Sequence, residues 1–378
     1  MVRTGVFMKR ASRSRSFIVP GVVLLSLFAL GAAACGTTAA TPAGDVTAPP
    51  PDDEAGASSG GDPGAEGGTS SGNPIGPDGA PIHGPDTVTI VVEPTDKAQA
   101  LLTAIQAAKK SVHMTMYLLN DKRFINALIA QKSAGLDVKV TLNKTFPMNA
   151  GTNTAAYSAL QAGGVPVVWA ASTFTLTHEK SVVIDGQSAW IMTMNLENTS
   201  SQNREFLALD VDLPDVQEAD AMFAADFAGT PYVPNGFLLI APINARDRIL
   251  QLIQAAKTTI DLEGEELSDY KIVNALAVAQ KAGVKVRVVV ADNAPPTSQA
   301  NAVAQLKTAG VAVVKVANPY IHAKAVVADG AQAYVGSENF TTGSLQYNRE
   351  LGLITTNPPA VKVVGQTIAA DFAAGTAL

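Results

Sequence analysis

The chain of 378 residues contains one cysteine, Cys35, so an internal disulfide is excluded. Histidine is almost as scarce, with four residues in the whole chain. The sequence also lacks a glycine-rich phosphate loop and a cysteine–histidine cluster with the spacing of metal ligands. It therefore predicts neither a bound cofactor nor a metal site.

Positive charge is in short supply as well. Lysine and arginine total 27 against 33 acidic residues, which gives a formal net charge of −6. Five of the basic residues fall at positions 3–15, and seven of the acidic residues fall at positions 45–78. Setting these five positive and seven negative charges aside leaves a net charge of about −4 on the rest of the chain. Proteins that bind nucleic acids normally present an excess of Lys and Arg, so a nucleic-acid partner is disfavoured.

The N-terminal segment 1–34 has the features of an export signal. Its basic start is followed by an apolar run at 17–30, which is too short for a membrane-spanning helix with such flanks. Cys35 follows Gly-Ala-Ala-Ala, which resembles the cleavage site of a bacterial lipoprotein, although Ala32 stands where Leu is usual. We expect export to the cell envelope, with a lipid anchor at Cys35. Ordinary cleavage after Ala34 and secretion is the alternative.

Residues 35–85 are rich in Gly, Pro, Ser, Thr, Ala and Asp and have almost no large apolar side chains. Such a segment cannot bury enough apolar surface to offset the entropy of ordering it. The sequence predicts a disordered acidic tether here, and His83 is expected to be one of its solvated residues.

Half of the histidines lie in the same local pattern, His-x-Lys-x4-Asp, at 178–185 and 322–329. Each pattern continues alike, with a hydroxyl residue 15 positions and an asparagine 17 positions after the histidine, and then an Asn-Arg-Glu tripeptide at 203–205 or 348–350. The hydroxyl residues are Thr193 and Ser337, and the asparagines are Asn195 and Asn339. Two matching sets predict one active site that is built from two halves.

The rest of the chain supports an internal duplication. Strand and helix patterns alternate twice; predicted helices at 98–109 and 245–257 correspond, and so do predicted strands at 111–118 and 259–263. The segments Phe-Ile-Asn-Ala-Leu at 124–128 and Ile-Val-Asn-Ala-Leu at 272–276 are separated by 148 positions. We predict an α/β fold of two similar halves, 86–232 and 233–378, each with a parallel or mixed sheet, packed about a pseudo-twofold axis.

The geometry of a strand orients the motif residues. Both Lys-containing strands are followed by Asp-Gly, which favours a tight hairpin turn. Residues two apart on a strand point to the same side, so His178 pairs with Lys180, and His322 with Lys324. Asp185 and Asp329 lie an odd number of positions further on and should support the turn rather than touch a substrate. The return strands bring Thr193 and Asn195, or Ser337 and Asn339, to the site as donors for a phosphate group.

Two histidines can divide the work of phosphoryl transfer. One attacks phosphorus as a neutral imidazole, and the other protonates the leaving oxygen. A buried carboxylate should hold the far ring nitrogen of each histidine, and Glu205 and Glu350 are the candidates because they occupy matching positions.

The doubled pattern resembles the phospholipase D superfamily, whose motif is His-x-Lys-x4-Asp-x6-Gly-Ser-x-Asn in two copies. The second copy fits at every fixed position, whereas the first has Met192-Thr193 in place of Gly-Ser. The resemblance covers roughly residues 86–378 and implies a covalent phosphohistidine. It assigns His178 as nucleophile and His322 as acid, with Lys180, Lys324, Asn195 and Asn339 as the phosphate clamp.

Other polar and aromatic residues receive structural interpretations. His113 is expected to be a satisfied polar position, and Trp169 and Trp190 are expected to lie in the core. The acidic cluster Glu263, Glu265 and Glu266 is predicted to be a solvated rim, with Glu265 aligned to Tyr117 at the border of the cleft.

The resulting prediction is a phosphodiesterase that hydrolyses or exchanges phospholipid head groups at a membrane surface. The alternatives are a secreted nuclease of the same superfamily, a cardiolipin-synthase-like phosphatidyltransferase, and a phosphate-binding protein without turnover. Because duplication supplies both half-sites, we expect a monomer with an internal pseudo-dimer.

Overall fold

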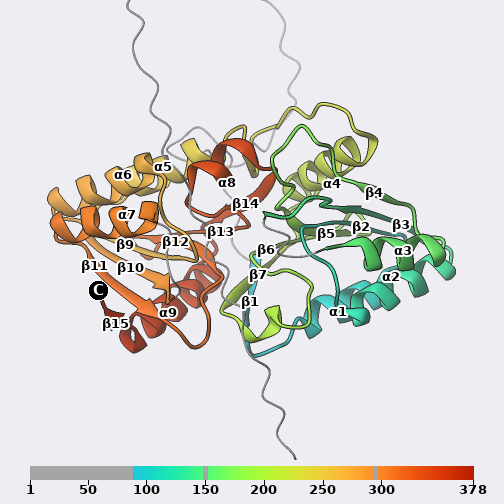
Figure 1. Ribbon diagram of the computed structural model, residues 1–378, viewed down its shortest axis with the longest axis horizontal. Coiled ribbons are helices and arrows are strands. Elements are labelled where there is room, and N and C mark those ends of the chain that lie inside the picture. The colour runs from blue at the N-terminus through green and yellow to red at the C-terminus, as the bar shows by residue number, and fades with distance from the viewer. Residues whose placement is uncertain (1–87, 148–151, 293–296) are drawn as a thin grey trace, which may run out of the picture. The chain divides into compact units, whose positions relative to one another are not determined.

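The computed structural model describes residues 88–147, 152–292 and 297–378 (Figure 1). They belong to one unit of the chain, Thr69–Leu378. The predicted export signal at 1–34, the tether at 35–85 and the lipidation site Cys35 lie outside the described residues. These three features stay predictions.

The first half carries a seven-stranded mixed sheet in the order β1-β7-β6-β5-β2-β3-β4. Strands β2, β3 and β4 are parallel to one another, and the remaining pairs are antiparallel. The strands are β1 (Val88–Glu93), β2 (Ser111–Met116), β3 (Asp137–Leu142), β4 (Val167–Trp169), β5 (Lys180–Ile184), β6 (Ser188–Met192) and β7 (Glu205–Asp210). The helices are α1 (Gln99–Ala107), α2 (Lys122–Ser133), α3 (Thr154–Ala162) and α4 (Leu213–Ala228), with a short 3-10 turn, η2 (Ser200–Gln202).

The second half carries an eight-stranded sheet in the order β15-β11-β10-β9-β12-β13-β14-β8. Its strands are β8 (Leu239–Ala241), β9 (Thr259–Gly264), β10 (Lys285–Ala291), β11 (Ala312–Val316), β12 (Lys324–Ala328), β13 (Gln332–Gly336), β14 (Glu350–Thr355) and β15 (Thr376–Ala377). Its helices are α5 (Ala245–Ala255), α6 (Tyr270–Lys281), α7 (Thr297–Thr308), α8 (Thr342–Tyr347) and α9 (Pro358–Ala374).

The two sheets have the same topology. Reading the second sheet from β8 gives β8-β14-β13-β12-β9-β10-β11, which matches β1-β7-β6-β5-β2-β3-β4 strand for strand. The extra strand β15 pairs with the edge of β11. The predicted fold class, two duplicated α/β halves with mixed sheets, is therefore confirmed.

Matching residues begin and end the matching helices. Asp121 caps α2 by accepting from the backbone N–H of Arg123, and Asp269 caps α6 by accepting from Lys271 and Ile272. Just after these helices, Gly135 and Gly283 adopt φ of 93° and 96°. This left-handed backbone is cheap only for glycine, so both helices stop at the positions that the sequence indicated.

Helices α1 and α5 end earlier than predicted, at Ala107 and Ala255 rather than at 109 and 257. The cause is the pair of aspartates in the hairpin turns. Asp185 accepts from the backbone N–H groups of residues 109–111, and Asp329 accepts from those of residues 257–259. These bonds hold the chain in the extended path that enters β2 and β9. Both aspartates thus act as scaffold.

Three apolar clusters hold the fold together, one within each half and one shared. The shared cluster contains Ile191 and Phe206 of the first sheet, Val327 and Leu351 of the second, and residues of α4 and α9. Strand β6 also contacts β13 and β14. Burial of this shared apolar surface stabilises the packing of the two halves against each other.

The aromatic and histidine side chains with structural interpretations behave as the sequence predicted. Trp190 is buried, and the partly buried Trp169 stacks on Tyr157 with ring centroids 4.2 Å apart. His113 lies 2.6 Å from Asp220 through Nδ1 and stacks on Phe223. Its imidazole is fully engaged in local contacts.

Candidate active site

The two hairpins bring the motif residues to one end of the sheets. His178 and His322 lie two residues before the first residues of β5 and β12, Lys180 and Lys324. At the other end of each hairpin, Asp185 and Asp329 adopt φ of 58° and 55° and are followed by glycines with φ of 64° and 63°. Two successive residues with positive φ are typical of the type I′ turn that Asp-Gly favours. The turns therefore lie a strand length away from the histidines.

The Asn-Arg-Glu segments cross from one half to the other. The backbone N–H groups of His178 and Glu179 donate to the carbonyl of Arg349, at 2.9 and 3.0 Å. In the reciprocal contact, the N–H of His322 donates to the carbonyl of Arg204, at 3.2 Å. Each histidine loop is thus paired with the tripeptide of the opposite half, and the residue that follows the arginine is a glutamate.

This crossing places Glu350 beside His178. The Nδ1 atom of His178 lies 2.8 Å from Glu350 Oε2. The carboxylate also accepts from the hydroxyls of Ser337 and Ser344, at 2.7 and 2.6 Å, and from the amide of Asn348. A carboxylate fixed by so many donors must accept from Nδ1–H, so the lone pair of the imidazole is on Nε2.

Glu205 takes the equivalent place beside His322. Its Oε1 lies 2.7 Å from His322 Nδ1, and its Oε2 accepts from the hydroxyl of Thr193. Both glutamates are fully buried. The sequence identified these carboxylates as the partners of the histidines, and the structure adds that each one braces the histidine of the other half.

The hydroxyls of Thr193 and Ser337 have a different role from the predicted one. Both side chains are fully buried, and each hydroxyl donates to a glutamate while accepting from a backbone N–H, that of Phe206 or Leu351. A hydroxyl has one proton to donate, so neither has one left for a phosphate group. We therefore replace the phosphate-binding prediction: these hydroxyls orient the carboxylates.

The lysines and asparagines complete the polar lining. Each lysine Nζ donates to the carbonyl of its own motif histidine. The buried Oδ1 atoms of Asn195 and Asn339 have no hydrogen-bond partner among the described residues. Buried polar atoms are nearly always paired, so these two acceptors are suited to a water molecule or to a hydroxyl of a substrate, and the NH2 groups of the same amides are donors for phosphoryl oxygens.

Burial sets the electrostatics of the site. It lowers the pKa of His178 to about 4, with Glu350 opposing this shift and the ammoniums of Lys180 and Lys324 adding to it. Burial also lowers the pKa of Lys180 to about 7, against the opposing effect of Glu350. The pKa of Glu350 is lowered, because His178 and its other donors outweigh the effect of burial. At neutral pH, His178 is a neutral imidazole beside an ionised carboxylate.

Sequence reasoning missed the full role of one acidic residue, Glu265, which follows β9. Its Oε2 lies 3.0 Å from Lys324 Nζ and 3.4 Å from His322 Nε2. Glu263 is fully buried, so the prediction of a solvated rim is wrong for it. In the first half, Tyr117 packs its ring against His178 with centroids 4.5 Å apart. The alignment of Tyr117 with Glu265 was the available signal, because both follow the strand that ends at the site.

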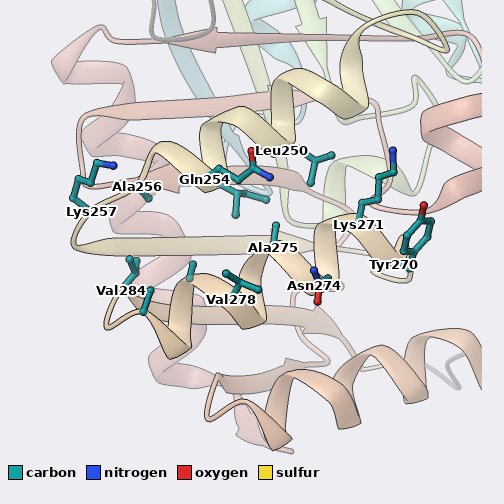
Figure 2. Close-up of a pocket in the computed structure, with 13 residues that line it drawn as sticks. Leu250, Gln254, Ala256, Lys257, Tyr270, Lys271, Asn274, Ala275, Val278 and Val284 are labelled. Atoms are coloured by element: carbon teal, nitrogen blue, oxygen red, sulfur yellow. The ribbon is translucent and has the colours of Figure 1, made fainter. Parts of the chain in front are cut away.

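A separate groove of about 780 Å³ lies between α5 and α6 on the second half (Figure 2). Tyr270 and Lys271 lie toward one end of it, and Lys257 and Val284 lie toward the other. None of the motif residues lines this groove, so it is distinct from the histidine site.

The described residues offer neither a metal centre nor a membrane-spanning helix. No group of three or more His, Cys, Asp or Glu side chains there is arranged to hold a metal ion. No helix of the described ranges combines the length and the apolar character needed to cross a membrane.

The braced histidine pair defines a class of site. Two imidazoles, each with a buried carboxylate beside Nδ1, lie with two ammoniums and two amides at the junction of two duplicated halves. This is the arrangement implied by the resemblance to the phospholipase D superfamily.

Comparison with known proteins agrees. The chain belongs to the family described as cardiolipin synthase, PLD-like domain, which matches residues 101–227 and 249–372. It is 24% identical over 324 residues to a cardiolipin synthase of Listeria innocua, covering 72% of this chain and 66% of the relative. It is 33% identical over 124 residues to a mitochondrial cardiolipin hydrolase of Xenopus tropicalis, covering 32% of this chain and 59% of that protein.

Among solved structures, the phosphatidylserine synthase of Haemophilus influenzae has the same fold, with a TM-score of 0.62 at 12% identity, covering 79% of this chain and 88% of that one. The chain spans about two thirds of the length of the cardiolipin synthases that it matches.

Proposed function

We propose that this protein is a phosphatidyltransferase of the cardiolipin-synthase type, which moves a phosphatidyl group from one phospholipid to an alcohol through a phosphohistidine. The observation that carries this proposal is the pair of histidines braced by Glu350 and Glu205 across the two halves. Two imidazoles with distinct partners supply the nucleophile and the acid that phosphoryl transfer needs.

In the first step, the Nε2 lone pair of His178 attacks phosphorus and forms an N–P bond. The bond between phosphorus and the leaving alcohol breaks, and its electron pair stays on the alcohol oxygen. That oxygen takes the proton from His322 Nε2. Lys180, Lys324 and the amides of Asn195 and Asn339 offset the charge on the phosphoryl oxygens.

In the second step, the hydroxyl of an acceptor gives its proton to His322, which is now neutral and acts as base. Its oxygen attacks phosphorus, the N–P bond breaks, and the electron pair returns to Nε2 of His178. A glycerol hydroxyl of a second phospholipid gives a transfer product, whereas water gives phosphatidic acid. The chemistry of both outcomes is the same up to the choice of acceptor.

Two observations favour a phospholipid over a polyanionic substrate. The relatives that match most of this chain are named cardiolipin synthases. The chain outside the predicted signal and tether is acidic rather than basic. We also propose that export and a lipid anchor at Cys35 hold the protein at the cell envelope, and that nucleic acid is a lesser partner.

Hydrolysis is the second candidate. It is the activity named for the Xenopus relative, which is more similar to this chain over its shorter match than the cardiolipin synthases are. It would require only that water reaches phosphohistidine before an alcohol does.

The first prediction is a product test. Purified protein is offered vesicles of labelled phosphatidylglycerol, and the products are separated. We expect cardiolipin and free glycerol, with phosphatidic acid as the minor product. His322→Ala should slow turnover by about 10²- to 10⁴-fold, since it removes the acid, and His178→Ala should abolish the covalent intermediate.

His113→Gln is the matched control, because it changes a histidine outside the site and should leave turnover unchanged. Phosphatidic acid as the main product would select hydrolysis. Inert vesicles together with rapid cleavage of single-stranded DNA would overturn the lipid substrate. Unchanged activity in both histidine variants would overturn the site itself.

A further inference from the structure

The site is nearly symmetric, and its clearest departure from symmetry lies where β2 and β9 end. After β2 the first half has Tyr117, whose ring packs edge-on against His178 and lies 5.0 Å below the ammonium of Lys180. After β9 the second half has Glu265 in the aligned position. One histidine therefore faces an aromatic ring and the other a carboxylate.

Glu265 is held firmly in this place. Its Oε1 accepts from the hydroxyl of Tyr320 at 2.9 Å, and its Oε2 accepts from Lys324 Nζ at 3.0 Å. The pKa of the carboxyl is lowered far below its usual range, because the neighbouring His322 and Lys324 and the hydroxyl of Tyr320 outweigh the effect of burial. It is thus an ionised group beside the reactive nitrogen of His322.

The charged groups around the two histidines differ accordingly. His322 has a carboxylate at each ring nitrogen, Glu205 at 2.7 Å from Nδ1 and Glu265 at 3.4 Å from Nε2, with Lys324 close by. His178 has one carboxylate, Glu350, and the ammoniums of Lys180 and Lys324 act on it. Opposite charge at both nitrogens favours the cationic imidazolium, and net positive surroundings favour the neutral ring.

We propose that Glu265 is a positioning residue that sets the direction of the reaction: it keeps His322 protonated before substrate binds and so makes His322 the acid and His178 the nucleophile. The inference rests on the proposed phosphoryl transfer but not on the identity of the lipid. It assigns a role to a residue outside the repeated motif.

The position of Glu265 also implies competition with the substrate. The oxygen that contacts Lys324 Nζ and His322 Nε2 stands where an oxygen of a phosphodiester must bind to be clamped and protonated. The substrate phosphate therefore displaces the carboxylate from Lys324. One anion replaces another, so His322 keeps a negative neighbour while the proton is transferred.

The second prediction tests the protonation of His322 directly. The ring signals of the full-length protein are followed by proton–carbon NMR as a function of pH, with His322→Asn used to assign the signal. In Glu265→Gln, which keeps the shape and removes the charge, His322 should lose its proton at a pH lower by about 1–2 units than in the wild type. Glu265→Asp should give an intermediate value.

Glu266→Gln is the matched control. It removes a carboxylate one residue away that, within the described part of the chain, forms no ion pair with His322 and acts on it only at longer range. It should shift the titration of His322 in the same direction but by clearly less than Glu265→Gln does, because its carboxylate acts on the ring from farther away. An equal shift in both variants, or no shift in Glu265→Gln and Glu265→Asp, would overturn the proposal.

Kinetics provide an independent test with a generic phosphodiester such as bis(p-nitrophenyl) phosphate. Glu265→Gln should lower KM several-fold at neutral pH, because the competitor for Lys324 is gone. It should also move the alkaline limb of kcat/KM to lower pH, because less of His322 carries a proton in the free enzyme. A rise in KM with unchanged pH dependence would mean a structural role only. The pKa of Lys180 is also lowered to about 7, so loss of its charge could cause the fall in activity at alkaline pH as well. The NMR titration shows which of the two groups, Lys180 or His322, causes that fall.

Failure of the lipid proposal is distinguishable from failure of this one. If the protein cleaves the generic diester but not phospholipid, the proposed lipid function is wrong, and the role of Glu265 can still be tested with the generic diester. A protein inert on both substrates still gives the NMR result. Mapping the phosphohistidine after an alkaline quench completes the test, since wild-type label on His322 would overturn the assigned direction.

Discussion

At the scale of single residues, surroundings give two chemically identical imidazoles different tasks. The side chain of His178 is buried, and the ammoniums of Lys180 and Lys324 add positive charge around it. Glu350 opposes them, and Tyr117 packs edge-on against the ring. The pKa of His178 falls to about 4 as a result, so its Nε2 lone pair is available over the whole physiological range.

The third prediction is the pH dependence that follows. Protonation of His178 removes the nucleophile, so kcat/KM should fall as the pH drops through about 4 and should be flat above that on the acidic side. A neutral histidine with an unperturbed pKa of about 6.5 would give a limb at that higher pH instead. The measurement is kcat/KM against pH with a generic diester. A limb near the unperturbed value would contradict the buried electrostatics described above.

At the scale of secondary structure, the Asp-Gly turn has two structural roles. It reverses the hairpin, and its carboxylate fixes the chain between the preceding helix and strand. Asp329 accepts from the backbone N–H groups of residues 257–259 and from the hydroxyl of Thr258. These donors lower its pKa to about 2 despite the opposing effect of burial. The stability that they supply is present above the unfolded pKa of about 3.9 and is lost as the pH falls toward 2.

The fourth prediction separates this scaffold from the chemistry. Asp329→Ala removes the acceptor of these backbone bonds. It also leaves at φ 55° a residue whose side chain cannot stabilise the left-handed backbone by hydrogen bonding. We therefore expect a loss of about 1–2 kcal/mol in the free energy of unfolding. Asp329→Asn keeps one acceptor oxygen and tolerates the left-handed backbone, so its loss should be smaller. Urea denaturation followed by circular dichroism measures both.

The turn lies at the opposite end of the hairpin from His322 and Lys324. Neither Asp329 variant should therefore change kcat/KM under conditions where the protein stays folded. A large loss of activity in stable, folded Asp329→Asn would show that the aspartate acts in the site and not as scaffold.

The elements show what the sequence could and could not predict. Strands, hairpins and the duplication followed from apolar periodicity, from Asp-Gly and from matched spacing, because these are local properties. The histidines, lysines and glutamates of the site were found because they recur at fixed offsets. The crossing of the Asn-Arg-Glu segments was not predicted, since backbone pairing between Arg349 and His178 depends on how the halves pack. Nor could spacing show that the hydroxyls of Thr193 and Ser337 are used by buried carboxylates.

At the scale of the whole molecule, neither half holds a complete site. His178 depends on Glu350 of the second half, and His322 depends on Glu205 of the first. Ion pairs reinforce the crossing: Arg204 binds Asp371 of α9, and Arg349 binds Asp226 of α4. Together with the shared core, these contacts join two imperfect copies into one working unit within a single chain.

The fifth prediction concerns that unit. If one chain supplies both half-sites, the active species is a monomer, and specific activity should be independent of protein concentration. Mixing His178→Ala with His322→Ala should then give no more activity than the two variants show separately, because each chain keeps its own damaged site. Light scattering on the same samples should give the mass of one chain. If the active form were instead a dimer that exchanged halves, some pairs would contain one site with both histidines, and activity would return and increase with concentration. The buried cross-bracing argues against this exchange, since separating the halves would expose the shared apolar core and leave Glu205 and Glu350 without their histidine partners.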